Sequence, residues 1–436
     1  MMEIIIIATF STLCFLIISK LGRHIKLEKQ ILFLILGIII GIILNKTGYE
    51  SLDNIFPNIS HYNMTALMFM FFCAGFTINV KLLKKSGSLT AKLFSIPTYF
   101  EAILMSIIIF EIVKMIPSVG YTLGFLEALI IAAIFSTSSP ANIIPICSSM
   151  IKEGYTDKNN IPGTIILSSI VDGFVIFPIV FAPIFILAAQ NAGTNITFYK
   201  IILIVLGSII AIAVTLLLGI IIGRFIIATT SFVFKKFSSD KQPKYKDYFV
   251  ILLAFALSIG ITSLLQNIPS LKTAISVFGI LIMCGIGASI NHYDQTGVKD
   301  IIKKDGNNLF ALFGMPIIFI YVGSGININS LLNIKQLIFF TAITFTAVYI
   351  KGLAAKFVLR NPKYSKGERK FAARCYIPKG MSLINFTVLF GAVFNSKSSF
   401  ISFMSMLGAI AVIVSMSVGL PMISKSKGTL IKRSDS

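Results

Sequence analysis

A single carboxylate, Asp172, lies in the middle of an apolar stretch that spans residues 161–189. If this stretch is a helix that rises about 1.5 Å per residue, Asp172 lies about 16 Å from its start, near the middle of a bilayer core about 30 Å thick. A charge at that depth is costly and persists mainly where it faces a cavity, a partner charge or an ion. The position therefore indicates an ion-binding carboxylate. The alternative is an aspartate that only hydrogen-bonds a neighbouring helix.

The preceding apolar stretch, residues 123–151, is interrupted by a run of four hydroxyl residues and Pro140. Proline lacks a backbone donor and disfavours helix at the residue before it, so the sequence predicts a broken helix here. Neutral oxygens near the break suit a weakly held alkali cation, although hydroxyls in membrane helices also bond back to their own helix. The candidate ligands are Thr137, Ser138, Ser139 and Asn142. A broken helix beside a midplane carboxylate is typical of the ion sites of secondary transporters.

Other charges also lie deep in apolar stretches. Glu101 is expected about 15 Å into the span at residues 91–114, and Arg374 and Lys379 lie within residues 369–394. Because charges inside a membrane usually pair, we expect a structural bridge between Glu101 and Arg374, with a direct transport role as the minority alternative.

The composition places these residues in a polytopic membrane protein. The chain has 436 residues, of which 56% are hydrophobic and only 13% are charged. The net charge of +21 does not indicate nucleic-acid binding, because the lysines and arginines lie in short loops between apolar runs. No zinc-protease, aspartic-protease or nucleotide-binding motif is present, so we expect neither an enzyme nor a bound cofactor.

The apolar windows predict an all-α membrane protein with about thirteen transmembrane helices. The expected spans are 3–21, 30–46, 62–80, 91–114, 123–151, 161–189, 198–230, 247–266, 271–290, 307–327, 334–358, 369–394 and 398–424. Loops after odd-numbered spans are rich in basic residues, whereas those after even-numbered spans carry one lysine each. This alternation predicts an N-terminus outside the plasma membrane and a C-terminus in the cytoplasm.

An internal repeat relates the two halves of the chain. Residues 71–80 align with residues 319–328, and the two segments are expected to cross the membrane in opposite directions. The interpretation is one transmembrane domain, 1–436, with repeat one at 1–190, a connector helix at 198–230 and an inverted repeat two at 247–424. The second repeat has its own expected break at Pro378-Lys379-Gly380, so two broken helices would cross.

The chain resembles the monovalent cation:proton antiporter superfamily. The resemblance rests on Ser139-Pro140-Ala141-Asn142-Ile143-Ile144-Pro145, then Lys152-Glu153-Gly154-Tyr155, Ile161-Pro162 and Ser168-Ser169-Ile170-Val171-Asp172-Gly173. Looser pieces are Phe71 to Asn79, Pro316 to Asn327, Ile350 to Ala355 and Ile377 to Gly380. The order of these pieces covers nearly the whole chain, and they resemble the branch with S-P-A-x-x-x-P and a D-D or N-D pair.

The resemblance implies that Asp172 alternately holds a proton and Na⁺ or K⁺, and that the chain forms a homodimer. It also implies that Lys351 pairs with the acidic site; the alternative is a lysine that reaches the cytoplasm along the membrane interface. The chain departs from the pattern because Val171 and Gly173 flank a single acid. Asp172 is either the first acid, with glycine in place of the second, or the second acid, with valine in place of asparagine.

A single carboxylate favours one-for-one, electroneutral exchange. Two alternatives remain open at this point: a cation channel or uniporter on the same scaffold, and a sensor that binds an ion without moving it. An antiporter couples cation movement to proton movement, whereas a channel or uniporter does not. A sensor binds the ion without any flux.

Overall fold

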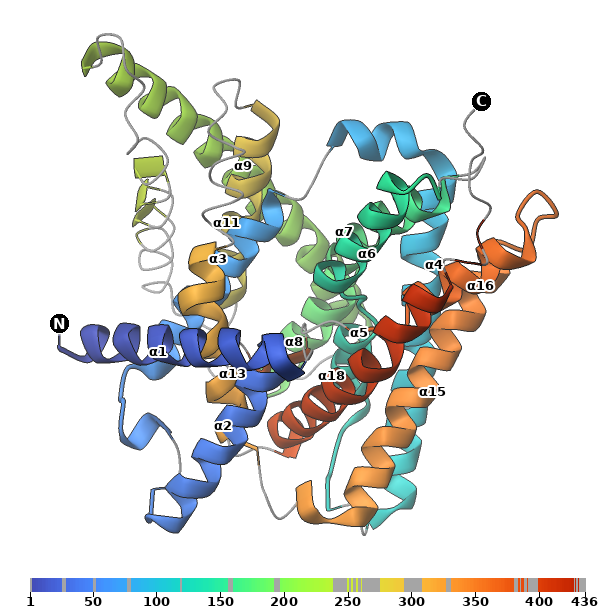
Figure 1. Ribbon diagram of the computed structural model, residues 1–436, viewed down its shortest axis with the longest axis horizontal. Coiled ribbons are helices and arrows are strands. Elements are labelled where there is room, and N and C mark those ends of the chain that lie inside the picture. Colours follow the sequence, from blue (N-terminus) through green and yellow to red (C-terminus); the bar gives the residue numbers. More distant parts are fainter. Residues whose placement is uncertain are drawn as a thin grey trace. The chain divides into compact units, whose positions relative to one another are not determined.

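In the computed structural model, helices make up most of the described part of the chain, and no strand is named there (Figure 1). The described residues are 2–25, 29–49, 52–76, 80–117, 120–155, 160–191, 197–237, 249–250, 252–253, 256–257, 260, 275–293, 308–326, 331–379, 383–384, 386–387, 390, 399–426, 428 and 430. Within them, six helices are long and apolar enough to cross a membrane. The polytopic all-α fold is thus confirmed. The count of thirteen spans stays a prediction, because the span expected at 247–266 lies mostly outside the described residues.

The helices gather into two compact units. The first unit comprises Met1–Val80, Ile202–Gly325 and Val388–Val393. The second comprises Lys81–Ile201, Ile326–Thr387 and Phe394–Ser436. Each unit therefore combines chain from both halves of the sequence, and the division into repeats at 1–190 and 247–424 stays a prediction.

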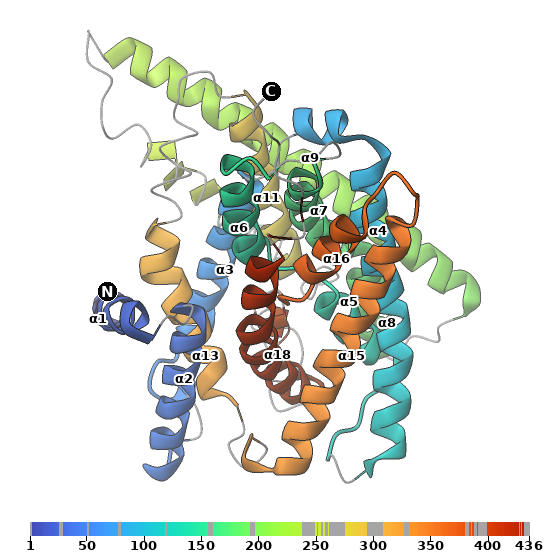
Figure 2. The same ribbon diagram turned by 45° about the vertical axis from the view of Figure 1, so that its right-hand side comes forward.

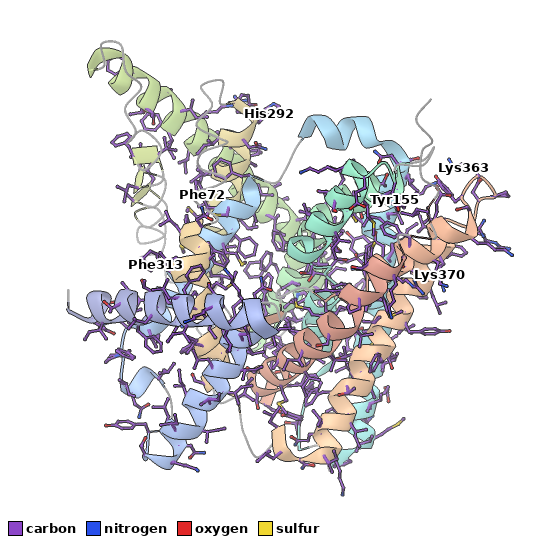
Figure 3. The ribbon with its side chains drawn as sticks, in the orientation of Figure 1. Phe72, Tyr155, His292, Phe313, Lys363 and Lys370 are labelled. Atoms are coloured by element: carbon purple, nitrogen blue, oxygen red, sulfur yellow. The ribbon has the colours of Figure 1, made fainter. Side chains whose placement is uncertain are left out.

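In the first unit, helices approach closely through glycine. Its helices are α1 (Met2–Ile25), α2 (Lys29–Lys46), η1 (Leu52–Asn54), α3 (Ile59–Gly75), most of α9 (Phe198–Phe237), α11 (Ile275–Tyr293), the π-helical turn η4 (Phe310–Gly314) and α13 (Met315–Ser324). α2 packs on α13 and α3 packs on α11. A Cβ added at Gly323 would lie 2.5 Å from the Leu34 carbonyl oxygen, so only glycine permits the α2–α13 contact. Phe72 of α3 is completely buried in this unit (Figure 3).

The second unit contains eight helices among its described residues (Figure 2). They are α4 (Val80–Met115), α5 (Phe125–Phe135), α6 (Pro140–Lys152), α7 (Ile161–Val175), α8 (Phe177–Asn191), α15 (Ile334–Val358), α16 (Lys366–Cys375) and α18 (Ser399–Lys425). α6 packs on α7, α5 on α8, and α15 on both α16 and α18.

One end of this second unit is a dense apolar cluster. Its buried members come from α4, α6, α7, α15, α16 and the C-terminal end of α18, and include Leu93, Ile165, Phe371 and Tyr376. Lys363 and Lys370 lie outside this cluster and are exposed, on and beside the turn that joins α15 to α16 (Figure 3). The cluster packs α4, α7 and α15 together, and these helices carry Glu101, Asp172 and Lys351.

Three apolar stretches of the second unit are interrupted. The break expected after residue 135 is present, because α5 ends at Phe135 and α6 begins at Pro140. The break near residue 378 is present too, since α16 ends at Cys375 and the chain leaves it in a non-helical conformation; Gly380 lies outside the described residues. The span expected as continuous over 161–189 is instead divided at Ile176 into α7 and α8.

Candidate functional site

Two hydroxyls of the run after α5 bond back to carbonyls in the last turn of that helix, which also accept backbone N–H groups. Ser136 Oγ donates to the Ala133 carbonyl at 2.7 Å, and Thr137 Oγ1 donates to the Ile134 carbonyl at 2.9 Å. Pro140 then starts α6, where its missing N–H would have had no partner inside the helix. The sequence therefore breaks the helix without leaving these carbonyls unsatisfied in an apolar environment.

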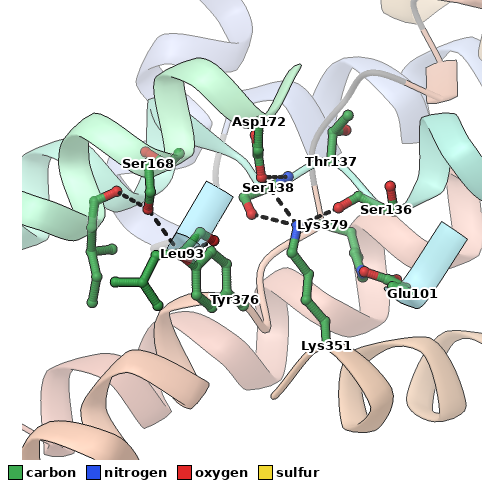
Figure 4. Close-up of polar contacts among 12 residues, drawn as sticks. Leu93, Glu101, Ser136, Thr137, Ser138, Ser168, Asp172, Lys351, Tyr376 and Lys379 are labelled. Atoms are coloured by element: carbon green, nitrogen blue, oxygen red, sulfur yellow. Dashed lines mark hydrogen bonds and ion pairs between the residues drawn. The ribbon is translucent and has the colours of Figure 1, made fainter. Parts of the chain in front are cut away.

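The two breaks meet in an antiparallel pairing of their backbones. Ser138, between α5 and α6, pairs with Lys379, which follows α16. The crossing of two broken helices that the sequence predicts is thus present. The backbone N–H of Ser138 donates to Asp172 Oδ2 at 2.9 Å, which fixes the carboxylate of α7 against the crossing (Figure 4).

Lys351 of α15 forms an ion pair with Asp172. Its Nζ lies 3.1 Å from Asp172 Oδ2 and 2.8 Å from Ser138 Oγ, and it also donates to the Ser136 carbonyl (Figure 4). All three ammonium donors can therefore be used within the protein. Both charged side chains are completely buried, so Lys351 does not extend to the interface as the alternative interpretation required.

Asp172 uses one oxygen for its contacts within the described part of the chain. Its Oδ2 accepts from Ser138 and Lys351, whereas its Oδ1 is buried and has no hydrogen-bond partner among the described residues. A buried carboxylate oxygen without a partner is costly, and such groups in native proteins call for a specific explanation. An oxygen in this state is a ready ligand for a proton or an alkali cation.

A second buried ion pair corrects one expectation. Glu101 of α4 pairs with Lys379, not with Arg374, and both of its members are completely buried. Arg374 instead donates to Ser426 Oγ at 2.7 Å and to the Met422 carbonyl at 3.5 Å, at the end of α18. The expected bridge is wrong because the chain stops being helical after Cys375, and this brings Lys379 rather than Arg374 to the acid.

The other neutral ligands expected from the sequence are Thr137, Ser139 and Asn142. Thr137 and Ser139 are buried at the break, and the bond of Thr137 to its own helix follows the local alternative. The side chain of Asn142 lies outside the described residues. Ser138, one of the neutral ligands proposed from the sequence, contacts both members of the charged pair directly.

Sequence reasoning missed a polar chain beside the site. The Tyr376 hydroxyl donates to the Leu93 carbonyl at 2.9 Å and lies 2.9 Å from Ser168 Oγ (Figure 4). The ring of Tyr376 has the Lys351 ammonium 5.1 Å from its centroid, within the range of a cation–π contact. A tyrosine directly before the Ile377-Pro378 break was the available signal, since a buried tyrosine hydroxyl needs a partner.

Known proteins resemble this chain over nearly its whole length. Residues 6–425 match the family described as "Sodium/hydrogen exchanger, transmembrane". Among solved structures, the chain is similar to the sodium proton antiporter MjNhaP1 from Methanocaldococcus jannaschii, determined at pH 8. The TM-score is 0.66 and the identity 18%, over 98% of this chain and 99% of that chain. No curated protein sequence matches the chain.

Proposed function

The chain belongs to the sodium/hydrogen exchanger family, and we propose that this multi-pass membrane protein exchanges cations for protons at Asp172. One observation carries the assignment of the residue. Asp172 is completely buried at the crossing of two broken helices, with one oxygen held by Lys351 and Ser138 and the other without a hydrogen-bond partner in the part of the chain that the structure describes.

Exchange follows from competition for one carboxylate. A cation that reaches Asp172 displaces the Lys351 ammonium and finds oxygens already gathered there: both carboxylate oxygens, Ser138 Oγ and the Ser136 carbonyl. These hard oxygen ligands suit an alkali cation. A proton on Asp172 releases the cation by removing the charge that held it, and loss of that proton restores the ion pair.

The charge count favours electroneutral exchange. If Lys351 keeps its proton throughout, Asp172 is neutralised once by a cation and once by a proton, so both directions move one positive charge. The transported ion is Na⁺ or K⁺, and the same ligand set serves either. The protein acts in the plasma membrane as a homodimer, with its N-terminus outside and its C-terminus in the cytoplasm.

The test is cation-induced release of a proton gradient in proteoliposomes, followed with a pH-sensitive dye. We compare the wild type with Asp172→Asn, and use Glu111→Gln near the end of α4 as the matched control. Addition of Na⁺ or K⁺ should dissipate the gradient in the wild type and the control but not in Asp172→Asn. The rate should not depend on an imposed membrane potential.

Other outcomes point to the other functions. Cation flux that follows voltage and moves no protons would identify a channel or uniporter. Cation binding without any flux by correctly inserted protein would identify a sensor. Either result would overturn the exchange proposed here.

A further inference from the structure

The Glu101–Lys379 pair has no part in the exchange proposed above, yet it is as deeply buried as the Asp172–Lys351 pair. Lys379 Nζ contacts Glu101 Oε1, and both side chains are inaccessible to solvent. Glu101 Oε2 is buried, and no described residue forms a hydrogen bond with it. Burial of a salt bridge is by itself a weak source of stability, because desolvation of both ions offsets their attraction.

Lys379 is built into the crossing that holds Asp172. Its backbone pairs with Ser138, whose N–H donates to the Asp172 carboxylate. Its own N–H donates to Ser415 Oγ of α18 at 3.0 Å. Its ammonium lies 5.1 Å from the ring centroid of Phe135, the last residue of α5. The second ion pair is thus connected directly to the backbone that positions the first.

We expect the two pairs to interact through their charges as well. They meet at one crossing, where the backbone of Lys379 pairs with Ser138 and the N–H of Ser138 donates to Asp172. All four side chains are completely buried, so solvent and salt screen these interactions little. The charges of the two carboxylates and the two ammonium groups sum to zero. A variant that removes the charge of Glu101 or Lys379 therefore leaves a net charge of one unit at the crossing.

We propose that the Glu101–Lys379 pair sets the cation affinity of the Asp172 site by keeping the charge around it balanced. This inference rests on the exchange proposed above. Glu101 and Lys379 are positioning residues, since they act on the ion through the field at Asp172 and not by direct contact. Neutralisation of Glu101 leaves Lys379 as an uncompensated positive charge that repels the cation, and neutralisation of Lys379 has the opposite effect.

The direction in which the cation KM changes separates this role from a purely structural one. A unit charge about 10 Å away at an effective dielectric of about 20 changes ion binding by roughly tenfold. A pair that only held helices together would, when broken, lower the amount of active protein and the maximal rate without changing the cation KM. A double variant that removes both charges restores the balance but not the contact.

The experiment measures the KM for Na⁺, or for K⁺ if that is the transported ion, in the proteoliposome assay at fixed pH. It compares the wild type with Glu101→Gln, Lys379→Gln and the double variant, and with Arg374→Met as a control from the same segment. Glu101→Gln should raise KM roughly tenfold and Lys379→Gln should lower it. The double variant should return to within about threefold of the wild type, and the control should not change KM.

The inference would be overturned if Glu101→Gln had the cation KM of the wild type. It would also be overturned if the double variant had a KM as high as that of Glu101→Gln. If Glu101→Gln does not fold, Lys379→Gln and the double variant test the same balance with the opposite sign. Proton movement by the wild type separates failure of the exchange proposal from failure of the charge-balance proposal. Absence of cation-dependent proton movement in the wild type refutes the exchange itself, whereas normal exchange with an unaltered KM in the variants refutes only this inference.

Discussion

Replacement of Lys351 by methionine tests whether its ammonium occupies the place of a cation. The variant keeps the length and most of the volume of the side chain but removes its bonds to Asp172, Ser138 and the Ser136 carbonyl. Removal of one partner of a buried ion pair costs about 3–5 kcal/mol, because the remaining charge stays buried without compensation. Asp172 keeps the Ser138 N–H, so we expect a loss of about 3 kcal/mol in the free energy of unfolding at high pH.

A transported cation should reverse most of this loss. An ion that binds only the folded protein stabilises it by about 2.7 kcal/mol when its concentration is about one hundred times its Kd. We therefore expect Na⁺ or K⁺ to stabilise Lys351→Met strongly, and the wild type less, because the wild-type ammonium competes for the same oxygens.

Thermal unfolding followed by far-UV circular dichroism measures these changes in purified protein, in Na⁺ or K⁺ and in choline. Lys370→Met, an exposed lysine on α16, is the control and should change stability by less than about 0.5 kcal/mol. The double variant Asp172→Asn with Lys351→Met should recover stability and lose its response to the cation. The reasoning is refuted if Lys351→Met unfolds like the wild type in choline, or if the cation stabilises both proteins equally.

Two further predictions concern the scaffold. Tyr376→Phe removes the hydroxyl that donates to the buried Leu93 carbonyl, and should lower the free energy of unfolding by about 1–3 kcal/mol; an unchanged melting temperature would contradict the assigned bond. Gly323→Ala would bring a Cβ to 2.5 Å from the Leu34 carbonyl oxygen and should destabilise the α2–α13 contact by about 1–3 kcal/mol. Gly207→Ala in α9, which meets no atom within 4 Å, should be neutral or slightly stabilising, and equal effects at both glycines would argue against close packing as the cause.

Much of the architecture could be predicted because it depends on residues close together in the chain. The break at residues 136–140 follows from one proline and four hydroxyl side chains, and the structure has it at the same place. The depth of Asp172 followed from counting along an apolar stretch. The interruption of that stretch at Ile176 was not predicted, because residues 161–189 are apolar on both sides of it.

The pairing of the buried charges could not be predicted in the same way. Counting along a continuous helix favoured Arg374 as the partner of Glu101, but α16 ends at Cys375 and the partner is Lys379. The direction of a side chain depends on the local backbone, so an unrecognised change from helix to extended chain changes which residue reaches a given acid. The Tyr376–Ser168 contact was missed for a related reason, since its two residues are far apart in sequence and meet only through packing.

The sequence by itself determined that this chain lies in a membrane and that two of its helices are broken, and it predicts one carboxylate near the middle of the bilayer. These properties follow from hydropathy, helix-breaking residues and rise per residue, all of which act locally. Only the tertiary structure decided that Ser138 N–H and Lys351 hold the same oxygen of Asp172, while no described residue bonds to the other oxygen. Burial makes each of these contacts strong, and burial arises only when segments distant in sequence pack together.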